Sequence, residues 1–336
     1  MERIVVFRFS AMGDVAMVAS VLQELSKQQP QLEIIMVSRK LFKPFFEHIP
    51  NVKVHLLDSK EKHKGFFGLY KLFKELKAYK PTYVADLHNN LRSRIVGTFF
   101  SLSGYKVKVL DKGRKEKKAL TRQENKVFKP LRNTTERYAD VFRALGFPIH
   151  LDNRLIKAMR PIPTRWEQLF PTEKKAIGIA PFAQHSYKVF PLQKMETVVS
   201  FLSSQGYSTF IFGGGKQEQE IAETWSRNFV GVYNTIGLGT ITEELDLISH
   251  LDAMISMDSS GMHMASLVGT RCLSIWGATH PYAGFLGYGQ SIDDCIQVEH
   301  ANRPSSVFGN KPCNCGGVEA IDLVTAEMVI KKIESL

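Results

Sequence analysis

The feature that most constrains the fold is an alternation of strand and helix signals that runs through the first part of the chain and then starts again. In the first series we expect a buried strand over 4–9 and further strands over 33–37, 52–56, 83–86 and 106–110. After the first strand, apolar residues recur with helical spacing at Val18, Val21, Leu22 and Leu25, which predicts a helix there. A last helix of this series is expected over 135–145. This βα alternation predicts a parallel sheet.

The second series starts at residue 176. Its expected strands are 176–180, 208–212, 232–234, 253–256 and 272–275, and its expected helices are 192–204, 217–227, 242–250 and 325–333. A proline-rich stretch over 147–175 separates the two series. We therefore predict an α/β protein with domains at 1–155 and 176–336 and a linker at 156–175. The closing helix at 325–333 could pack back on the first domain.

Composition narrows the class of protein. No apolar stretch approaches the roughly 18 residues of a membrane span, and Arg8 and Asp14 interrupt the N-terminal run, which argues against a signal peptide. We expect a cytoplasmic protein. The four cysteines form no CxxC pair, so reduced thiols are favoured over a zinc site. The sequence assigns no role to Cys295, Cys313 or Cys315.

Positive charge is concentrated in one segment. Residues 106–132 hold eleven Lys or Arg and three acidic residues, a net charge of +8 out of the formal +11 of the chain. Such a block can be a solvated loop, a nucleic-acid contact, or a surface for anionic lipid or phosphorylated glycan, and composition alone favours the loop. Because Phe128 is its only aromatic residue, we do not expect nucleic acid as a partner.

An anion site is predicted where the strand ending at Met257 turns into a helix, at Asp258-Ser259-Ser260-Gly261-Met262-His263. Backbone N–H groups at a helix N-terminus are unpaired and attract a diphosphate without any lysine. Gly261 is expected to let the ligand approach closely. The next strand ends in Trp276-Gly277, so two adjacent strand ends present polar turns to one crevice.

Asp14 follows Gly13 where the first strand turns into a helix. It can cap that helix, or its carboxylate can take a proton from a substrate hydroxyl. The sequence leaves both interpretations open.

Three further residues lie at expected strand ends. His263 is interpreted as a donor to a phosphate or ribose oxygen in preference to a core histidine. Lys188, in the loop after the strand at 176–180, is either solvated or placed to neutralise a leaving diphosphate. Glu218, after the glycines at 213–215, could bind a sugar hydroxyl.

Some expected signatures are absent. There is no Asp-x-Asp and no histidine cluster with metal-ligand spacing, so we expect neither a metal nor a cofactor. There is also no Gly-x-Gly-x-x-Gly after the first strand and no phosphate loop with a lysine, which disfavours dehydrogenases and P-loop enzymes.

Taken together, these pieces resemble glycosyltransferase family 9, the lipopolysaccharide heptosyltransferase family, over nearly the whole chain. The matching pieces are Gly13-Asp14, Asp86 with Arg92, the 181–191 loop, the 213–218 turn, the 258–265 helix start and Trp276-Gly277. The resemblance implies a GT-B fold, in which two Rossmann-like domains with parallel sheets face each other across a central cleft. It also implies inverting, metal-independent transfer from a nucleoside-diphosphate sugar, with ADP-heptose the expected donor, in lipopolysaccharide biosynthesis.

The resemblance also assigns roles by position. Asp14 matches the catalytic base, and Ser10, Gly13 and Gln184 match positions near donor or acceptor. The matched donor positions are Lys188, Glu218, Asp258, Ser259, Ser260, Gly261, Met262 and His263. Arg92, Arg114 and Lys115 match the side that faces a lipid-linked, acidic glycan acceptor. The basic segment would then hold the enzyme at the cytoplasmic face of the anionic inner membrane.

The chain departs from the family pattern at Phe182, Phe190 and Ser260-Gly261, positions expected to line the nucleotide and sugar pockets. Two other functions remain open: a nucleotide-sugar epimerase of the same architecture, and a basic nucleic-acid-binding protein.

Overall fold

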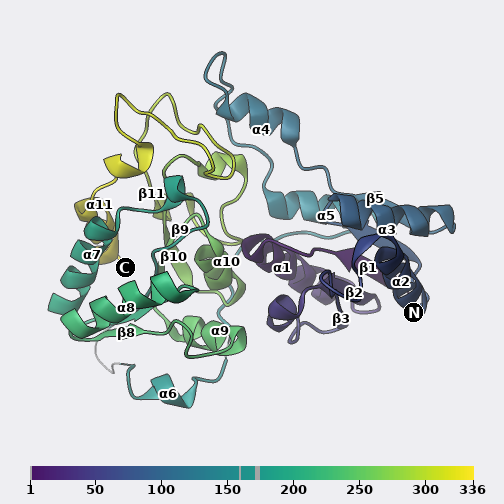
Figure 1. Ribbon diagram of the computed structural model, residues 1–336, viewed down its shortest axis with the longest axis horizontal. Helices are drawn as coiled ribbons and strands as arrows, with labels where there is room; N and C mark the ends of the chain where they lie inside the picture. The colour runs from purple at the N-terminus through teal and green to yellow at the C-terminus, as the bar shows by residue number, and fades with distance from the viewer. Residues whose placement is uncertain (1, 159, 171–174) are drawn as a thin grey trace. The chain divides into compact units, whose positions relative to one another are not determined.

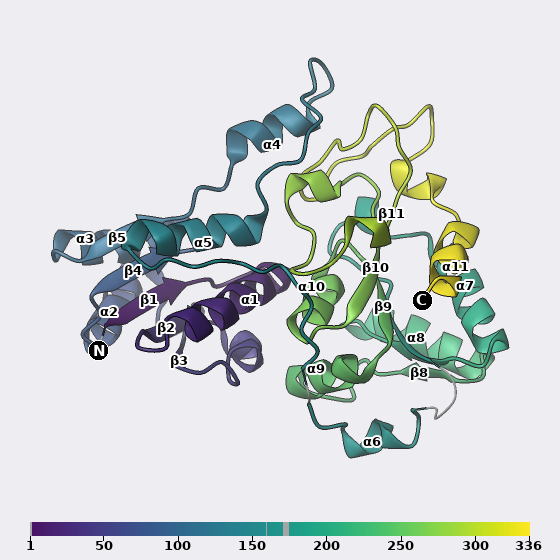
Figure 2. The same cartoon turned by 180° about the vertical axis from the view of Figure 1, so that it is seen from behind.

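The computed structural model describes residues 2–158, 160–170 and 175–336, which form two compact α/β units (Figures 1 and 2). The first unit comprises Met1–Lys112 and Thr134–Asp152, and the second comprises Gly113–Asn133 and Asn153–Leu336. Within the linker predicted at 156–175, residues 159 and 171–174, including Pro171, lie outside the described residues.

The first unit is built on a five-stranded parallel sheet of order β3-β2-β1-β4-β5. The strands are β1 (Arg3–Phe7), β2 (Glu33–Ser38), β3 (Val52–Leu56), β4 (Tyr83–Asp86) and β5 (Lys106–Val109). β1 is apolar at successive positions and Ile4 to Phe7 are fully buried, as expected for a strand covered on both faces.

Helices cover this sheet. They are α1 (Met12–Gln28), α2 (Gly65–Lys77), α3 (Leu91–Leu102) and α5 (Thr134–Leu145), with a 3₁₀ turn, η1 (Lys40–Phe45), after β2. Leu72 and Phe73 of α2 and Phe100 of α3 pack with Val5 and Phe7 in one core, whereas α1 packs against α5. α3 begins with a capping box between Asn90 and Ser93.

The second unit holds a six-stranded parallel sheet of order β11-β10-β9-β6-β7-β8. The strands are β6 (Ala176–Ala180), β7 (Ser208–Ile211), β8 (Val232–Asn234), β9 (Ala253–Met257), β10 (Arg271–Ile275) and β11 (Cys295–Ile296). The helices are α4 (Arg114–Thr121), α6 (Thr164–Glu167), α7 (Leu192–Ser204), α8 (Lys216–Asn228), α9 (Ile241–His250), α10 (Ser260–Leu267) and α11 (Ala326–Glu334). Short 3₁₀ turns are η2 (Ser186–Lys188), η3 (Pro281–Ala283), η4 (Ile292–Asp294) and η5 (Ala320–Leu323).

Residues 113–133 belong to the second unit, although they lie in the first series of the sequence. The Nζ of Lys117 lies 4.1 Å from the ring centroid of Phe285. The Nζ of Lys126 donates to the carbonyl oxygens of Ala301, Asn302 and Pro304 at 2.7–3.1 Å. The basic block therefore includes a helix and packed lysines, and differs from the solvated loop that composition favours.

The closing helix also completes the second unit. Its apolar side chains Val329 and Ile333 are buried in the core formed with α7 and the β6 to β10 strands. A contact of this helix with the first domain stays a prediction. In the described part of the chain, no helix is both long enough and apolar enough to span a membrane.

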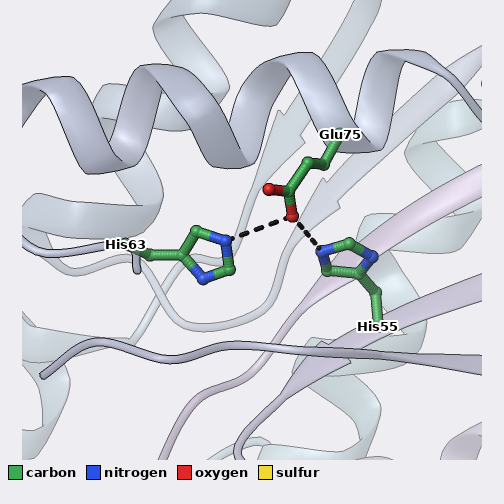
Figure 3. A group of neighbouring side chains, drawn as sticks. All are labelled: His55, His63 and Glu75. Atoms are coloured by element: carbon green, nitrogen blue, oxygen red, sulfur yellow. Dashed lines mark hydrogen bonds and ion pairs between the residues drawn. The ribbon is translucent and has the colours of Figure 1, made fainter. Parts of the chain in front are cut away.

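A polar network fastens α2 to β3 and to the loop before α2 (Figure 3). The Nε2 atoms of His55 and His63 each lie 3.2 Å from Oε2 of Glu75, and Lys62 lies 3.0 Å from its Oε1. The backbone N–H of Asp58 donates to Nδ1 of His63 at 3.1 Å. Since Nδ1 accepts, a neutral His63 carries its proton on Nε2 and donates it to Glu75. Burial raises the pKa of Glu75, but the hydrogen bonds from Lys62 and His63 outweigh burial and lower it.

We predict that Glu75→Ala destabilises the protein by about 1–3 kcal/mol, because the buried N–H of His63 loses its acceptor. The free energy of unfolding in urea measures this loss. The pKa of Glu75 is lowered in the folded state, so the loss should be complete above the ordinary value of 4.5 and should disappear as pH falls through the lowered pKa.

Glu223→Ala is the matched control. Glu223 pairs with Arg227 at 3.0 Å on the exposed face of α8, and removal of such a pair is expected to cost less than about 0.5 kcal/mol. Equal costs for the two variants would contradict the role given to the histidine network.

Candidate active site

Asp14 lies in the first turn of α1, directly beyond the carboxyl end of β1. The N-cap of α1 is Ala11, and no side chain caps the helix. Of the two interpretations that the sequence allows, the cap is therefore wrong, and the carboxylate is directed to other partners.

Those partners are a buried arginine and a buried tyrosine. Arg8 forms an ion pair with Oδ2 of Asp14 and donates from Nη1 to the carbonyl oxygen of Leu87 at 2.8 Å. The hydroxyl of Tyr138 donates to Oδ1 of Asp14 at 3.2 Å. Burial raises the pKa of Tyr138 well above its ordinary value, so this phenol stays a donor. The Asp14 side chain is 26% exposed, so the carboxylate is held firmly and still reaches solvent.

His88 lies close to this pair, just after β4. It is buried against Phe9, with ring centroids 5.0 Å apart, and its Nδ1 has no hydrogen-bond partner. Burial, together with the charge of Arg8, lowers the pKa of His88 to about 3. His88 is therefore a neutral imidazole buried beside the Arg8–Asp14 pair.

Asp86, which the resemblance groups with Arg92, is buried and organises the chain after β4. It accepts hydrogen bonds from the backbone of His88 and Asn89 at 3.0 and 2.7 Å and from Oγ of Ser93 at 2.8 Å. Burial raises its pKa. Asp86 therefore shapes the loop, whereas Arg92 is exposed in the first turn of α3 and remains open to a ligand.

In the second unit, Lys188 and Asp258 form an ion pair of 2.9 Å between Nζ and Oδ2. They follow β6 and β9, which are neighbouring strands of the sheet. The Asp258 side chain is 6% exposed. Gly309, at φ +73°, lies so close to the Lys188 stem that a Cβ there would be 2.2 Å from Cγ of the lysine. The ion pair and the close packing of Gly309 therefore hold Lys188 near the carboxyl ends of β6 and β9.

The predicted anion site is the start of α10. Ser259 is its N-cap and uses no side-chain cap, and Ser259 and Ser260 are partly exposed. The N–H groups of the first turn have no acceptor within the helix and can bind an anion. Met262 and His263 are buried in this helix.

Gly261 serves helix packing, and its contact with a ligand stays a prediction. It is buried, and a Cβ at this position would lie 2.6 Å from Cβ of Ala180 and 2.8 Å from Oγ of Ser256. The glycine therefore allows α10 to approach β6 and β9. Phe190 likewise lies in the core, fully buried, and does not line a pocket as expected, while Phe182 is partly buried beside Gly213.

Glu218 and Gln184 lie in neighbouring connections. Oε2 of Glu218 accepts the N–H of Gly214 at 2.7 Å, which orders the glycine turn after β7 and leaves the other carboxylate oxygen free of any bond to that turn. Gln184 is exposed in the loop after β6. In the first unit, Ser10 and Gly13 are partly exposed in the turn that carries Asp14.

Among the described residues, His55, His63 and Glu75 form the group whose ligand atoms lie close enough together to hold a metal ion, within 4.8 Å of one another (Figure 3). Metal binding through Nε2 of His63 would move its proton to Nδ1, which faces the N–H of Asp58. A ligating histidine normally donates from its second nitrogen to an acceptor. The arrangement therefore fits a hydrogen-bonded network better than a metal site.

A family model described as glycosyltransferase family 9 (heptosyltransferase) matches residues 69–306. The chain belongs to glycosyltransferase family 9.

Two curated relatives come from Haemophilus influenzae. Lipooligosaccharide heptosyltransferase 2 is 26% identical over 172 residues, about half of each protein (49% of this chain and 48% of the relative). Lipopolysaccharide core heptosyltransferase OpsX is 22% identical over 317 residues, 90% of this chain and 87% of the relative.

Solved structures show the same fold. A family 9 glycosyltransferase from Veillonella parvula aligns with a TM-score of 0.75 and 19% identity, covering 99% of this chain and 96% of that one. The Escherichia coli heptosyltransferase WaaC with ADP-2-deoxy-2-fluoro heptose aligns with a TM-score of 0.68 and 16% identity, covering 99% of each chain. The two parallel-sheet units of this glycosyltransferase therefore form a GT-B fold.

The expected acceptor residues of the glycosyltransferase are divided between the units. Arg92 lies in the first turn of α3 in the first unit, whereas Arg114 and Lys115 are exposed on α4 in the second. The sequence did not single out Arg8, His88 and Tyr138 as site residues. One signal in the sequence could have found them: Arg8 directly follows a buried apolar strand, and a buried arginine needs a counter-charge.

We predict that Tyr138→Phe lowers kcat about tenfold and changes KM little, because the ring stays in place while Asp14 loses one hydrogen bond that orients it. Steady-state kinetics measure this. Tyr83→Phe is the matched control, since the hydroxyl of Tyr83 also bonds a carboxylate, that of Glu2 at 3.0 Å, at an exposed position. Unchanged kcat in Tyr138→Phe would contradict the positioning role.

Proposed function

We propose that this enzyme transfers heptose from ADP-heptose to the acidic inner core of a lipid-linked lipopolysaccharide acceptor, with inversion and without a metal. Support for the donor comes from the relatives, since WaaC of Escherichia coli is solved with ADP-2-deoxy-2-fluoro heptose, and support for the acceptor comes from their lipopolysaccharide and lipooligosaccharide names. The observation that carries the proposal is the Asp14 carboxylate, held by Arg8 and Tyr138.

Asp14 is proposed as the general base. Each carboxylate oxygen has two lone pairs, and Arg8 and Tyr138 occupy one lone pair on each oxygen. A remaining lone pair can accept the proton of the acceptor hydroxyl as its oxygen attacks the anomeric carbon. Attack from the face opposite the diphosphate, in a single step, inverts the configuration at that carbon.

The start of α10 and Lys188 are proposed to hold the diphosphate. Backbone N–H groups of the first turn of α10 supply neutral donors, and Lys188 supplies positive charge as the leaving group forms. Asp258 accepts one of the three ammonium protons of Lys188 and leaves two for phosphate oxygens. Glu218 is proposed to bind a hydroxyl of the donor through its second carboxylate oxygen. Ser259, Ser260 and His263 complete this donor set.

Arg92, Arg114 and Lys115 are proposed to bind the acidic groups of the acceptor. Their exposure leaves the guanidinium and ammonium groups open to phosphate or carboxylate. We further propose that the enzyme works at the cytoplasmic face of the inner membrane, where attraction to anionic lipid is worth about 1 kcal/mol per basic residue near the surface.

We predict that Asp14→Asn lowers kcat about 100-fold to 10,000-fold, the range typical of a general base. The amide keeps the shape of the carboxylate and cannot take the proton. Turnover of ADP-heptose on acceptor measures the loss.

Donor binding and melting temperature of Asp14→Asn serve as controls, and both should stay close to wild type if the base alone is lost. Near-normal turnover would remove Asp14 from the mechanism. Wild-type turnover should survive EDTA and give a product of inverted anomeric configuration by NMR; retention or EDTA sensitivity would exclude those parts of the proposal.

We predict that ADP raises the melting temperature, because a ligand that binds only the folded state stabilises it by linkage. Lys188→Gln should lose most of this shift, and Lys331→Gln, an exposed lysine on α11, should keep it. A stronger shift with UDP or GDP than with ADP would overturn the assignment of ADP-heptose.

A further inference from the structure

α2 carries three exposed aromatic side chains in its first two turns. Phe66 is 61% exposed, Phe67 is 85% exposed and Tyr70 is 43% exposed. Phe67 is the most exposed aromatic residue of the described chain. Large apolar side chains gathered at one place on a surface mark an interaction site, whereas single ones do not.

These aromatics continue onto α3, which lies beside α2 (Figures 1 and 2). The ring of Phe99 lies 5.5 Å from the rings of both Phe66 and Tyr70, centroid to centroid. Leu102, three residues beyond Phe99 on the same side of α3, is 82% exposed. The apolar surface therefore spans two helices that are fixed to each other.

Lysines extend the same face. Lys71, Lys74 and Lys77 are exposed and share the stripe of α2 that begins with Phe67 and Tyr70. The Nζ of Lys74 lies 5.3 Å from the ring centroid of Tyr70. Over residues 60–80 the chain has seven lysines and two glutamates, a net charge of +5.

We propose that this aromatic and lysine face of α2 and α3, made of Phe66, Phe67, Tyr70, Lys71, Lys74, Lys77, Phe99 and Leu102, docks the protein on an anionic lipid bilayer. Aromatic rings enter the headgroup boundary, and lysines keep their ammonium groups at the phosphates. Charge favours this occupant over a second copy, because a symmetric contact would bring together two faces that both carry Lys71, Lys74 and Lys77.

The inference deepens the proposed function, since a lipid-linked acceptor places the reaction at a membrane, and it names a surface other than the basic helix α4. It involves neither Asp14 nor Lys188. Failure of membrane docking and failure of the transferase proposal can therefore be told apart.

The test is flotation of the full chain with vesicles of phosphatidylcholine alone or mixed with phosphatidylglycerol. Wild type should float with the mixed vesicles at low salt and less at high salt. Phe66→Ser/Phe67→Ser and Lys71→Glu/Lys74→Glu should each reduce partitioning about tenfold or more. Asp14→Asn should float like wild type even though it lacks transferase activity.

Val230→Ser is the matched apolar control, since Val230 is 87% exposed in the turn after α8, and Lys331→Glu is the matched charge control. Both should float like wild type. Turnover on a delipidated acceptor should be the same in Phe66→Ser/Phe67→Ser as in wild type, which shows that the variant folds.

Three results would overturn the proposal. The first is a wild type that does not float. The second is full flotation of Phe66→Ser/Phe67→Ser together with loss of flotation in Arg114→Glu/Lys115→Glu, which would assign the membrane contact to α4. Light scattering could also show a wild-type dimer that Phe67→Ser converts to a monomer, which would make the face a contact between copies.

Discussion

The direction of the strands decides where this protein can do chemistry. In a sheet whose strands are all parallel, every strand-to-helix connection leaves at the same edge. Asp14 and His88 follow neighbouring strands of the first sheet, and Lys188 and Asp258 follow neighbouring strands of the second. Residues far apart in the chain therefore become neighbours because of topology, before any side-chain contact is made.

The buried charge of Arg8 then holds the proposed base, Asp14, in place. Arg8 is 7% exposed, and a guanidinium at that depth requires a counter-charge and hydrogen-bond acceptors. Asp14 and the carbonyl oxygen of Leu87 supply them. The same carboxylate therefore stabilises the fold and is proposed to take the proton. Tyr138 bonds the other oxygen, so the group has little freedom to rotate away from a substrate.

The sequence predicts the regular elements well because their signals are local. The strands at 52–56, 83–86, 176–180 and 232–234 agree with the structure to the residue, since each is short, contains apolar or β-branched residues and is bounded by turn residues. The pairing of Asp14 with Tyr138 spans 124 residues and leaves no local signal. The composition of segment 113–133 predicts a solvated loop, because nothing in it shows that single lysines pack against distant residues, as Lys117 does over Phe285. The packing role of Gly261 also leaves no local signal, because one of the side chains that excludes a Cβ there, Ala180, is distant in the sequence.

The distribution of charge along the chain indicates which surfaces bind anionic partners. Residues 60–80 and 106–132 hold net charges of +5 and +8, so the rest of the chain, with a total of +11, carries a net charge of −2. The cores of both units are apolar and do not use this positive charge. Like charges concentrated within each region repel one another and cost stability, which an anionic partner would compensate. The first region adjoins the exposed rings of Phe66, Phe67 and Tyr70, which suit lipid. The second contains the exposed side chains of Arg114 and Lys115, which suit the phosphates of an acidic glycan.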